Sequence, residues 1–201
     1  MFVTLEGGEG AGKSTQARRL AAALDAAGRP ALLTREPGGA PGAEVLRRLL
    51  LSREHDWSPP AEIHLHFAAR AEHLAQTVQP ALAAGAVVVC DRFADSTMAY
   101  QGFGLGADRT LIAALTRLLP VQPDLTLVMQ VSPAVAAARV AARRQTLDRY
   151  EAMDAEFHAR VAAGFLAIAA AEPDRCVVVD ADGSADEVQA AVWSVVSVRL
   201  H

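Results

Sequence analysis

The sequence predicts an α/β fold in which a five-stranded parallel sheet is flanked by helices. Apolar, β-branched runs recur along the 201 residues, and each run after the first follows a stretch with helical periodicity. Strands that alternate with helices build crossover units, and the strands in such units are parallel. Ligands of these sheets bind at the carboxyl ends of the strands. The expected strands are Phe2–Leu5, Ala31–Thr34, Val87–Cys90, Leu125–Val131 and Cys176–Val179.

A glycine-rich loop after the first strand gives the strongest functional signal. Residues Gly7–Ser14 match the phosphate-binding pattern G-x-x-x-x-G-K-[ST] in full. Helical spacing of apolar residues predicts a helix from Ser14 to Ala27, so backbone N–H groups and a helix N-terminus converge on the loop. Lys13 is the only lysine of the chain, and its compact ammonium fits a loop that is too tight for a guanidinium. We therefore expect a protein that uses a nucleoside triphosphate.

The composition limits the possible partners. A net charge of −4 argues against a general nucleic-acid binder. No apolar run approaches the length that spans a membrane, and the first strand begins at Phe2, which leaves no room for a signal peptide. We expect one domain over residues 1–201, a cytoplasmic location, and neither a nucleic acid nor a membrane as partner. Cys90 and Cys176 border valine runs and are expected to be buried free thiols.

Two polar segments follow expected strands at the ligand-binding edge. Asp91 ends an apolar strand, which would place its carboxylate near a magnesium ion that Ser14 also touches, and Arg92 adds a cation there. Arg35 opens the turn Arg35–Gly39, whose proline and paired glycines make it stiff and rich in backbone groups. Arg35 is therefore placed either at a second phosphate or in an ordinary strand-to-helix loop.

A long helix is expected from Pro60 to Ala83, with Phe67 and Arg70 on nearly the same face. An aromatic ring beside a guanidinium fits a flat heterocycle that carries carbonyl oxygens. The alternative is that Arg70 pairs with a carboxylate such as Glu62 or Glu72.

Four arginines crowd the stretch after the fourth strand. Like charges one helical turn apart repel, so the cluster costs stability unless an anion or carboxylates answer it. Phosphoryl transfer needs cations around the migrating group, and an arginine-rich lid would supply them. The alternative is a solvated helix face. The four residues are Arg139, Arg143, Arg144 and Arg149.

Taken together, these residues resemble the bacterial type of thymidylate kinase. The resemblance runs in order through most of the chain, and two of its signatures are highly specific. The first is Arg-Glu-Pro-Gly-Gly at 35–39, and the second is Asp-Arg…Ser-Thr…Ala-Tyr-Gln-Gly at 91–102. The other matching segments are Phe67-Ala68-Ala69-Arg70, Pro123-Asp124-Leu125-Thr126-Leu127 and Asp148-Arg149-Tyr150-Glu151.

The resemblance implies a P-loop nucleoside monophosphate kinase fold with an arginine-rich lid at about residues 139–151. It also implies a homodimer that transfers phosphate from ATP to dTMP with Mg²⁺, giving dTDP and ADP in dTTP biosynthesis. The metal would lie at Ser14 and Asp91. The Glu36–Pro37 peptide bond is expected to be cis. The residues implied to bind ATP are Gly7, Gly8, Glu9, Gly10, Ala11, Gly12, Lys13, Ser14, Thr15 and Arg139.

The same resemblance implies how dTMP is held. Glu9 would bind the sugar 3′-hydroxyl, while Arg35 and Arg92 would hold the acceptor phosphate. Phe67 would stack on thymine, and Arg70 would donate to its O4 carbonyl. The remaining roles fall to Thr97 and Gln101, which would line the base and sugar pocket, and to Tyr100, which would crowd the 2′ position and favour deoxyribose.

One position departs from part of the family. Some members carry a catalytic arginine inside the loop where this chain has Gly10. The lid must then supply that cation. Arg144 and Arg149 fit a lid that ends in Asp-Arg-x-Glu. Because Arg139 and Arg143 lie close by, the identity of the catalytic lid arginine stays open. The implied catalytic set is Lys13, Glu9, Arg92, Arg144 and Arg149.

Other classes of protein use the same loop. A regulatory GTPase reads guanine with Asn-Lys-x-Asp, and this chain has no asparagine, so that class is excluded. Another small-molecule P-loop kinase is the main alternative, and assays of phosphate transfer to different acceptors distinguish it. A non-catalytic ATP-binding module would need no acceptor pocket, so Arg35, Phe67 and Arg70 count against it.

Overall fold

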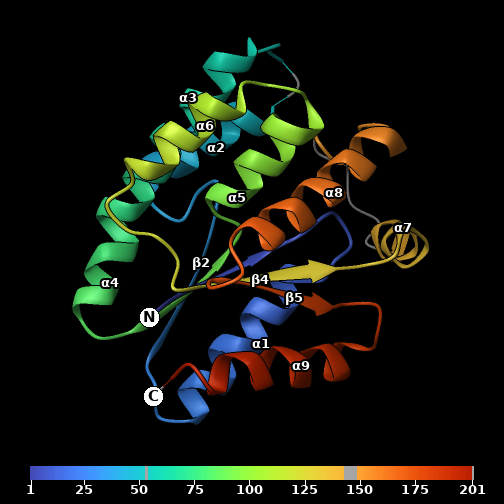
Figure 1. Cartoon of the computed structure of the whole chain (residues 1–201). Coiled ribbons are helices and arrows are strands. Elements are labelled where there is room, and N and C mark those ends of the chain that lie inside the picture. Colours follow the sequence, from blue (N-terminus) through green and yellow to red (C-terminus); the bar gives the residue numbers. More distant parts are fainter. Residues whose placement is uncertain (53, 143–148, 201) are drawn as a thin grey trace.

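The fold is a five-stranded parallel sheet with helices on both faces, as predicted (Figure 1). A computed structural model describes residues 1–52, 54–142 and 149–200. The strand order is β2-β3-β1-β4-β5, so the strand that leads into the glycine-rich loop is central. The strands are β1 (Phe2–Glu6), β2 (Ala31–Arg35), β3 (Val87–Asp91), β4 (Leu125–Gln130) and β5 (Cys176–Asp180).

The central strands are buried on both faces, which explains why they read as continuous apolar runs rather than as alternating patterns. Two of their polar side chains pair with each other across β1 and β4, where Thr4 and Thr126 share a hydrogen bond of 2.8 Å. The register aligns Leu5 with Asp91 and Arg35 with Asp91. The carboxyl ends of β1, β2 and β3 therefore meet at one edge.

Two helices cover one face of the sheet. α1 (Lys13–Ala26) and α9 (Ala185–Ser197) lie side by side below the sheet in Figure 1, and their apolar stripes share one core with β1 and β4. The other face carries α2 (Pro41–Leu51), α3 (Pro59–His73), α6 (Arg109–Arg117) and α8 (Ala155–Ala171). Two further apolar clusters fill the space between these helices and the sheet.

The helix expected over Pro60–Ala83 is present but changes its winding. α3 continues into a π-helical segment, η1 (Leu74–Val78), and then into α4 (Gln79–Ala83). Pro80 cannot donate the backbone bond that a regular helix needs, and a wider turn just before it accommodates that loss. The regular α-helical part, α3, therefore ends at His73 and includes His66, Phe67 and Arg70.

A second π-helical segment follows β3. The chain forms α5 (Ala94–Thr97) and then η2 (Met98–Gly104), which buries Tyr100 and Gln101. π-Helical turns are often found at functional sites, because the extra residue redirects side chains. Periodicity alone did not predict this segment.

Two further expectations are confirmed. The Glu36–Pro37 peptide bond is cis. Cys90 and Cys176 are buried and free. Within the described part of the chain, no helix is long and apolar enough to cross a membrane.

Candidate active site

The glycine-rich loop forms the floor of the site, between β1 and the first turn of α1. Lys13 is buried, and its Nζ donates to the carbonyl of Gly8 at 2.7 Å. Burial, and then the guanidinium of Arg92, lower the pKa of Lys13 to about 8. The ammonium is thus preformed inside the loop and remains protonated at neutral pH.

Gly10 lets another element approach the loop closely. Its φ is +73°, and a Cβ at this position would lie 2.5 Å from the carbonyl oxygen of Ala136 in α7 (Pro133–Ala142). Only glycine fits here while α7 keeps its position. Gly10 is therefore the point where α7 contacts the loop.

The predicted metal residues meet at the strand edge. The hydroxyl of Ser14 donates to Oδ2 of Asp91, although the two residues are 77 positions apart in the sequence. Hydroxyl and carboxylate oxygens are ligands that suit Mg²⁺, which keeps several waters and binds through one or two protein oxygens. The donor set therefore fits magnesium.

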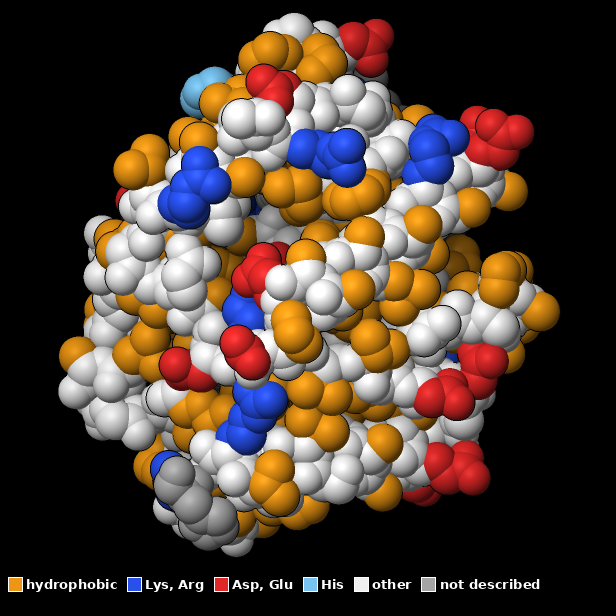
Figure 2. Space-filling model, in the orientation of Figure 1, with side chains coloured by type: hydrophobic (Ala, Val, Ile, Leu, Met, Phe, Trp, Pro, Cys, Tyr) orange, Lys and Arg blue, Asp and Glu red, His pale blue; other side chains and the backbone are white. Residues whose placement is uncertain are grey.

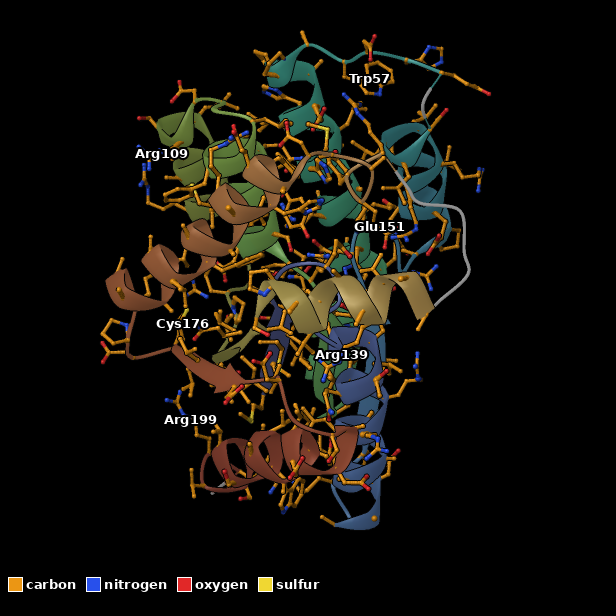
Figure 3. The ribbon with its side chains drawn as sticks, turned by 90° about the vertical axis from the view of Figure 1, so that its right-hand side faces the viewer. Trp57, Arg109, Arg139, Glu151, Cys176 and Arg199 are labelled. Atoms are coloured by element: carbon orange, nitrogen blue, oxygen red, sulfur yellow. The ribbon has the colours of Figure 1, made fainter. Side chains whose placement is uncertain are left out.

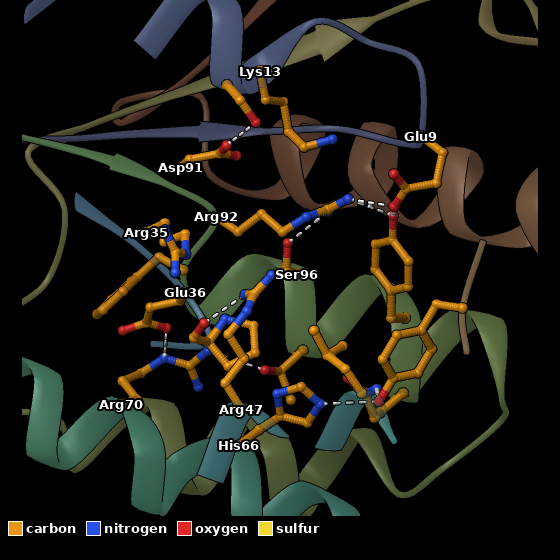
Figure 4. Close-up of a pocket in the computed structure, with 18 of the residues that line it drawn as sticks. Glu9, Lys13, Arg35, Glu36, Arg47, His66, Arg70, Asp91, Arg92 and Ser96 are labelled. Carbon is orange, nitrogen blue, oxygen red and sulfur yellow. Dashed lines mark hydrogen bonds and ion pairs between the residues drawn. The ribbon is translucent and has the colours of Figure 1, made fainter. Parts of the chain in front are cut away.

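Arg92 occupies the centre of the site in a left-handed backbone conformation, with φ +71°. Its Nη1 donates to the carbonyl of Gly7 at 3.1 Å, and its Nη2 donates to Glu9 and to the hydroxyl of Tyr100. Tyr100 in turn donates to Glu9 at 2.6 Å. Three predicted residues, from the loop, from the position just after β3 and from η2, thus form one hydrogen-bonded group (Figure 4).

Glu6 fixes the backbone that follows Arg92. Its buried carboxylate accepts the backbone N–H of Phe93 at 2.7 Å and the hydroxyl of Ser96 at 2.6 Å. Burial, and then the charge of Asp95, raise the pKa of Glu6 to about 8. Glu6 was not predicted as a site residue, because a carboxylate at a strand end carries no sequence signal of its partners.

Arg70 lies in a buried chain of polar groups rather than beside Glu62 or Glu72. Its Nε donates to Glu36 at 2.7 Å and its Nη2 to Thr97 at 3.1 Å. The other oxygen of Glu36 accepts Nδ1 of His73 at 2.9 Å. Among the described residues, Nη1 of Arg70 is a buried donor with no hydrogen-bond partner.

Phe67 lies behind Arg70. Its ring is buried with Ile63 and Ile112, and the guanidinium carbon of Arg70 lies 4.8 Å from the ring centroid. His66, one position earlier, lines the main cavity, which Phe67 does not. Burial, and then the charges of Arg70 and Arg149, lower the pKa of His66 to about 3, so the ring is neutral.

A second buried carboxylate, that of Glu62, holds several polar side chains near the cavity. Glu62 accepts hydrogen bonds from the amide of Gln101 at 2.8 Å and from the hydroxyl of Tyr150 at 2.9 Å. Its other oxygen pairs with Arg149 at 3.2 Å. His66 adds to the group, with Nε2 3.2 Å from the hydroxyl of Tyr150. Glu62 thus joins a residue of the predicted pocket to a residue of the predicted lid.

The main cavity connects these groups. It has a volume of about 420 Å³ and extends from Lys13, Ser14 and Asp91 to Arg70 and Tyr150. Arg35 also lines it and pairs with Glu44 at 3.0 Å. Arg47 reaches the carbonyl of Pro37 at 2.6 Å and lines the cavity as well, a cation that the sequence analysis missed.

A second cavity of about 390 Å³ lies on the other side of the loop. Arg139 of α7 borders it and donates to the carbonyls of Ala181 at 2.7 Å and Gly183 at 2.8 Å, in the loop before α9 (Figure 3). The predicted loop residues Gly10, Ala11, Gly12 and Thr15 line it too.

The predicted lid is described only in part. Arg139, Arg149 and Tyr150 are placed, whereas Arg143, Arg144 and Asp148 lie outside the described residues. In the view of Figure 2, the lysine and arginine side chains are separated from one another by apolar and neutral groups. No continuous basic surface appears on that face.

Comparisons with known proteins agree with one another. A family model described as thymidylate kinase matches residues 5–192. The thymidylate kinase of Caulobacter vibrioides is 52% identical, covering 99% of this chain and 97% of that protein. The thymidylate kinase of Gluconobacter oxydans is 52% identical, covering 100% and 95%. The crystal structure of thymidylate kinase from Ehrlichia chaffeensis superposes with a TM-score of 0.81 at 36% identity, covering 98% of each chain.

Proposed function

Because this chain belongs to the thymidylate kinase family, we propose that its main cavity holds dTMP and that the loop and second cavity hold ATP. The reaction transfers a phosphoryl group from ATP to dTMP and gives dTDP and ADP in dTTP biosynthesis. One observation carries the proposal. The main cavity is lined both by Lys13 and by Arg70, whose Nη1 has no hydrogen-bond partner in the described part of the chain.

The donor nucleotide is proposed to bind along the loop. Gly7, Gly8, Glu9, Gly10, Ala11, Gly12, Ser14 and Thr15 would surround its phosphates, with Lys13 as the cation between them. Arg139 would close the second cavity over the nucleoside, since its guanidinium is already held by backbone carbonyls. Its fixed, planar group is suited to lie against a flat base.

Magnesium is proposed to lie at Ser14 and Asp91. When bound, the ion neutralises charge on the β- and γ-phosphates. The hydrogen bond between the two side chains supports this placement, since it already brings their oxygens together.

The acceptor phosphate is proposed to lie between Arg35 and Arg92, which line the same cavity as Lys13. Glu9 would then hold the 3′-hydroxyl of the sugar, and Tyr100 would crowd the 2′ position. The bond from Tyr100 to Glu9 at 2.6 Å supports these two roles, because it fixes both side chains near one point. Charge that develops during transfer is stabilised by Lys13, Arg92 and a lid arginine, for which Arg149 and Arg144 are the candidates.

The base is proposed to lie near Arg70, with Thr97 and Gln101 at its edge. Nη1 of Arg70 needs an acceptor, and the O4 carbonyl of thymine is one. Cytosine carries an amino group at that position, and two facing donors would leave both unpaired.

A matched pair of variants tests the two placements. Arg92→Ala should raise the KM for dTMP at least tenfold and change the KM for ATP little, whereas Arg139→Ala should do the reverse. The two arginines border different cavities, so each variant is the control for the other. The opposite pattern of KM values would show that the two nucleotides have been assigned to the wrong cavities.

We also propose that residues 1–201 form one kinase domain, that the protein is cytoplasmic and that it is a homodimer. Val45 and Leu49 of α2 are exposed apolar residues, which is consistent with a partner on that helix. Light scattering of the purified protein, beside Val45→Glu, tests the homodimer. A monomeric wild-type chain would contradict it.

A further inference from the structure

His66, and not Phe67, lines the main cavity in which a base would bind. His66 lies one helical turn before Arg70 on α3, so both side chains belong to the same face of the helix. Both line the cavity. Figure 4 shows His66 and Arg70 side by side on the helix beneath the site. A ring on this face, next to the donor that awaits a carbonyl, is in position to meet a pyrimidine.

Phe67 is committed elsewhere. The guanidinium of Arg70 lies over its ring at 4.8 Å, and Ile63 and Ile112 pack in the same buried cluster. A base stacked on Phe67 would have to displace one of these contacts. The arrangement makes Phe67 a support for Arg70, through a cation–π contact.

The other rings of the cavity are also occupied. Arg92 lies over Tyr100 at 4.8 Å, and the Tyr100 hydroxyl holds Glu9. Phe93 is fully buried and packs edge-on against Phe2, with ring centroids 5.0 Å apart. Tyr150 packs against Tyr100 at 5.8 Å.

We propose that the imidazole of His66 contacts the face of the thymine ring and is the base platform of this chain. The proposal rests on the placement of dTMP in the main cavity and deepens it. Stacking on a flat side chain is insensitive to the substituents at the base edge, because every base has a π-face. His66 would therefore supply affinity, and Arg70 would supply discrimination between thymine and cytosine.

The hydrogen bonds of Tyr150 hold the platform. The Tyr150 hydroxyl donates its single proton to Glu62 at 2.9 Å, so it accepts from Nε2 of His66 at 3.2 Å. His66 is therefore the Nε2–H tautomer, and its ring plane is fixed from the far side. Tyr150 directly follows the lid residue Arg149 in the chain. The hydrogen bond between His66 and Tyr150 therefore connects the base platform to the predicted lid.

Calorimetric titration of the protein distinguishes the contribution of the base to binding affinity from that of the sugar and phosphate. The ligands are dTMP, dCMP and 2-deoxyribose 5-phosphate, which has no base. His66→Ala should weaken dTMP and dCMP to the same extent, on the order of tenfold. It should leave 2-deoxyribose 5-phosphate unchanged. His66→Phe keeps a flat ring and should bind dTMP within about threefold of the wild type.

Two further variants control the experiment. His64→Ala changes an exposed histidine on the same helix and should bind all three ligands normally. Phe67→Leu removes the support of Arg70, so it should narrow the difference between dTMP and dCMP, which His66→Ala should not. Near-ultraviolet circular dichroism and the melting temperature establish that each variant is folded.

Three outcomes would overturn the proposal. The first is a folded His66→Ala variant that binds dTMP as the wild type does. The second is an equal loss for 2-deoxyribose 5-phosphate, which would place His66 at the sugar or phosphate. The third is a Phe67→Leu variant that weakens dTMP and dCMP equally while His66→Ala has no effect, which would return the platform to Phe67. If Arg92→Ala also left dTMP binding unchanged, the placement of dTMP in this cavity would fail instead.

Discussion

The Nε of Arg70 donates to Oε2 of Glu36 at 2.7 Å, and both side chains are 2% exposed. A buried ion pair of this kind is costly unless its remaining polar atoms are satisfied. The second oxygen of Glu36 is satisfied by His73, whereas Nη1 of Arg70 has no partner among the described residues. The pair thus holds one donor ready for a ligand.

Removal of that donor should reduce discrimination between bases. Arg70→Ala is expected to narrow the preference for dTMP over dCMP, chiefly by weakening dTMP. An unpaired buried donor facing the amino group of cytosine costs about 1–3 kcal/mol, or roughly 5- to 150-fold in kcat/KM. Competition assays with both nucleotides on both proteins measure the ratio. If the ratio is unchanged, thymine is read elsewhere.

Lys13 is expected to be indispensable, and arginine is not expected to replace it. Lys13 is buried, and its Nζ donates to the carbonyl of Gly8 at 2.7 Å, a contact that the larger planar guanidinium is not expected to reproduce. Lys13→Ala and Lys13→Arg should each lower kcat by on the order of a hundredfold or more, while the melting temperature stays close to that of the wild type. Normal turnover by Lys13→Arg would disprove the close fit.

The same lysine should give the enzyme an alkaline limit. Its pKa of about 8 in the free protein means that the ammonium is lost as the pH rises through that value. The kcat/KM for ATP, which reports on the free enzyme, should therefore fall above a pH of about 8. Bound phosphates favour the ammonium, so kcat should fall only at higher pH. A flat kcat/KM profile from pH 7 to about 9.5 would contradict this assignment.

Arg149 should affect the chemical step more than substrate binding. It pairs with Glu62 at 3.2 Å, but one of its nitrogens, Nη1, has no hydrogen-bond partner among the described residues. Arg149→Ala is expected to lower kcat by about tenfold or more and to raise the KM for dTMP less, since a transition-state contact appears in kcat. Arg144→Ala tests the other candidate in the same assay. If both variants retained full kcat, the lid arginines would be structural.

Glu6 should make stability depend on pH. Its folded-state pKa of about 8 lies above the ordinary value of 4.5, so the native state retains a proton that the unfolded state loses. The free energy of unfolding should therefore decrease as the pH rises from 4.5 to about 8, and the cost is complete above that. Denaturant titrations should show a flatter profile for Glu6→Gln over this window. Parallel profiles for the two proteins would be evidence against the raised pKa.

Much of the fold was predictable because its signals are local. Apolar runs and glycines identified all five strands, and the loop pattern identified Lys13 and Ser14. The edge rule for parallel sheets also anticipated that Ser14 and Asp91 would meet. The π-helical segment at Met98–Gly104 was not predictable, since one extra residue in a turn leaves no clear change in periodicity.

The partners of side chains were harder to predict. Spacing along the helix suggests Glu62 or Glu72 as the ion-pair partner of Arg70. The partner in the structure is Glu36, which lies in the turn after β2. The stacking role predicted for Phe67 comes from the family resemblance, and its spacing from Arg70 agrees with that role. No signal in the sequence indicates that His66, one position earlier, lines the cavity. The structure distinguishes the two residues, because Phe67 packs with Ile63 and Ile112 whereas His66 lines the cavity.

The contact between Gly10 and Ala136 restricts the evolutionary paths open to this chain. A side chain at position 10 would collide with the backbone of α7 at 2.5 Å. An arginine at position 10 is therefore sterically incompatible with α7 in its present position against the loop. Gly10→Arg alone would be a dead end, and the substitution becomes accessible only after changes that first displace α7.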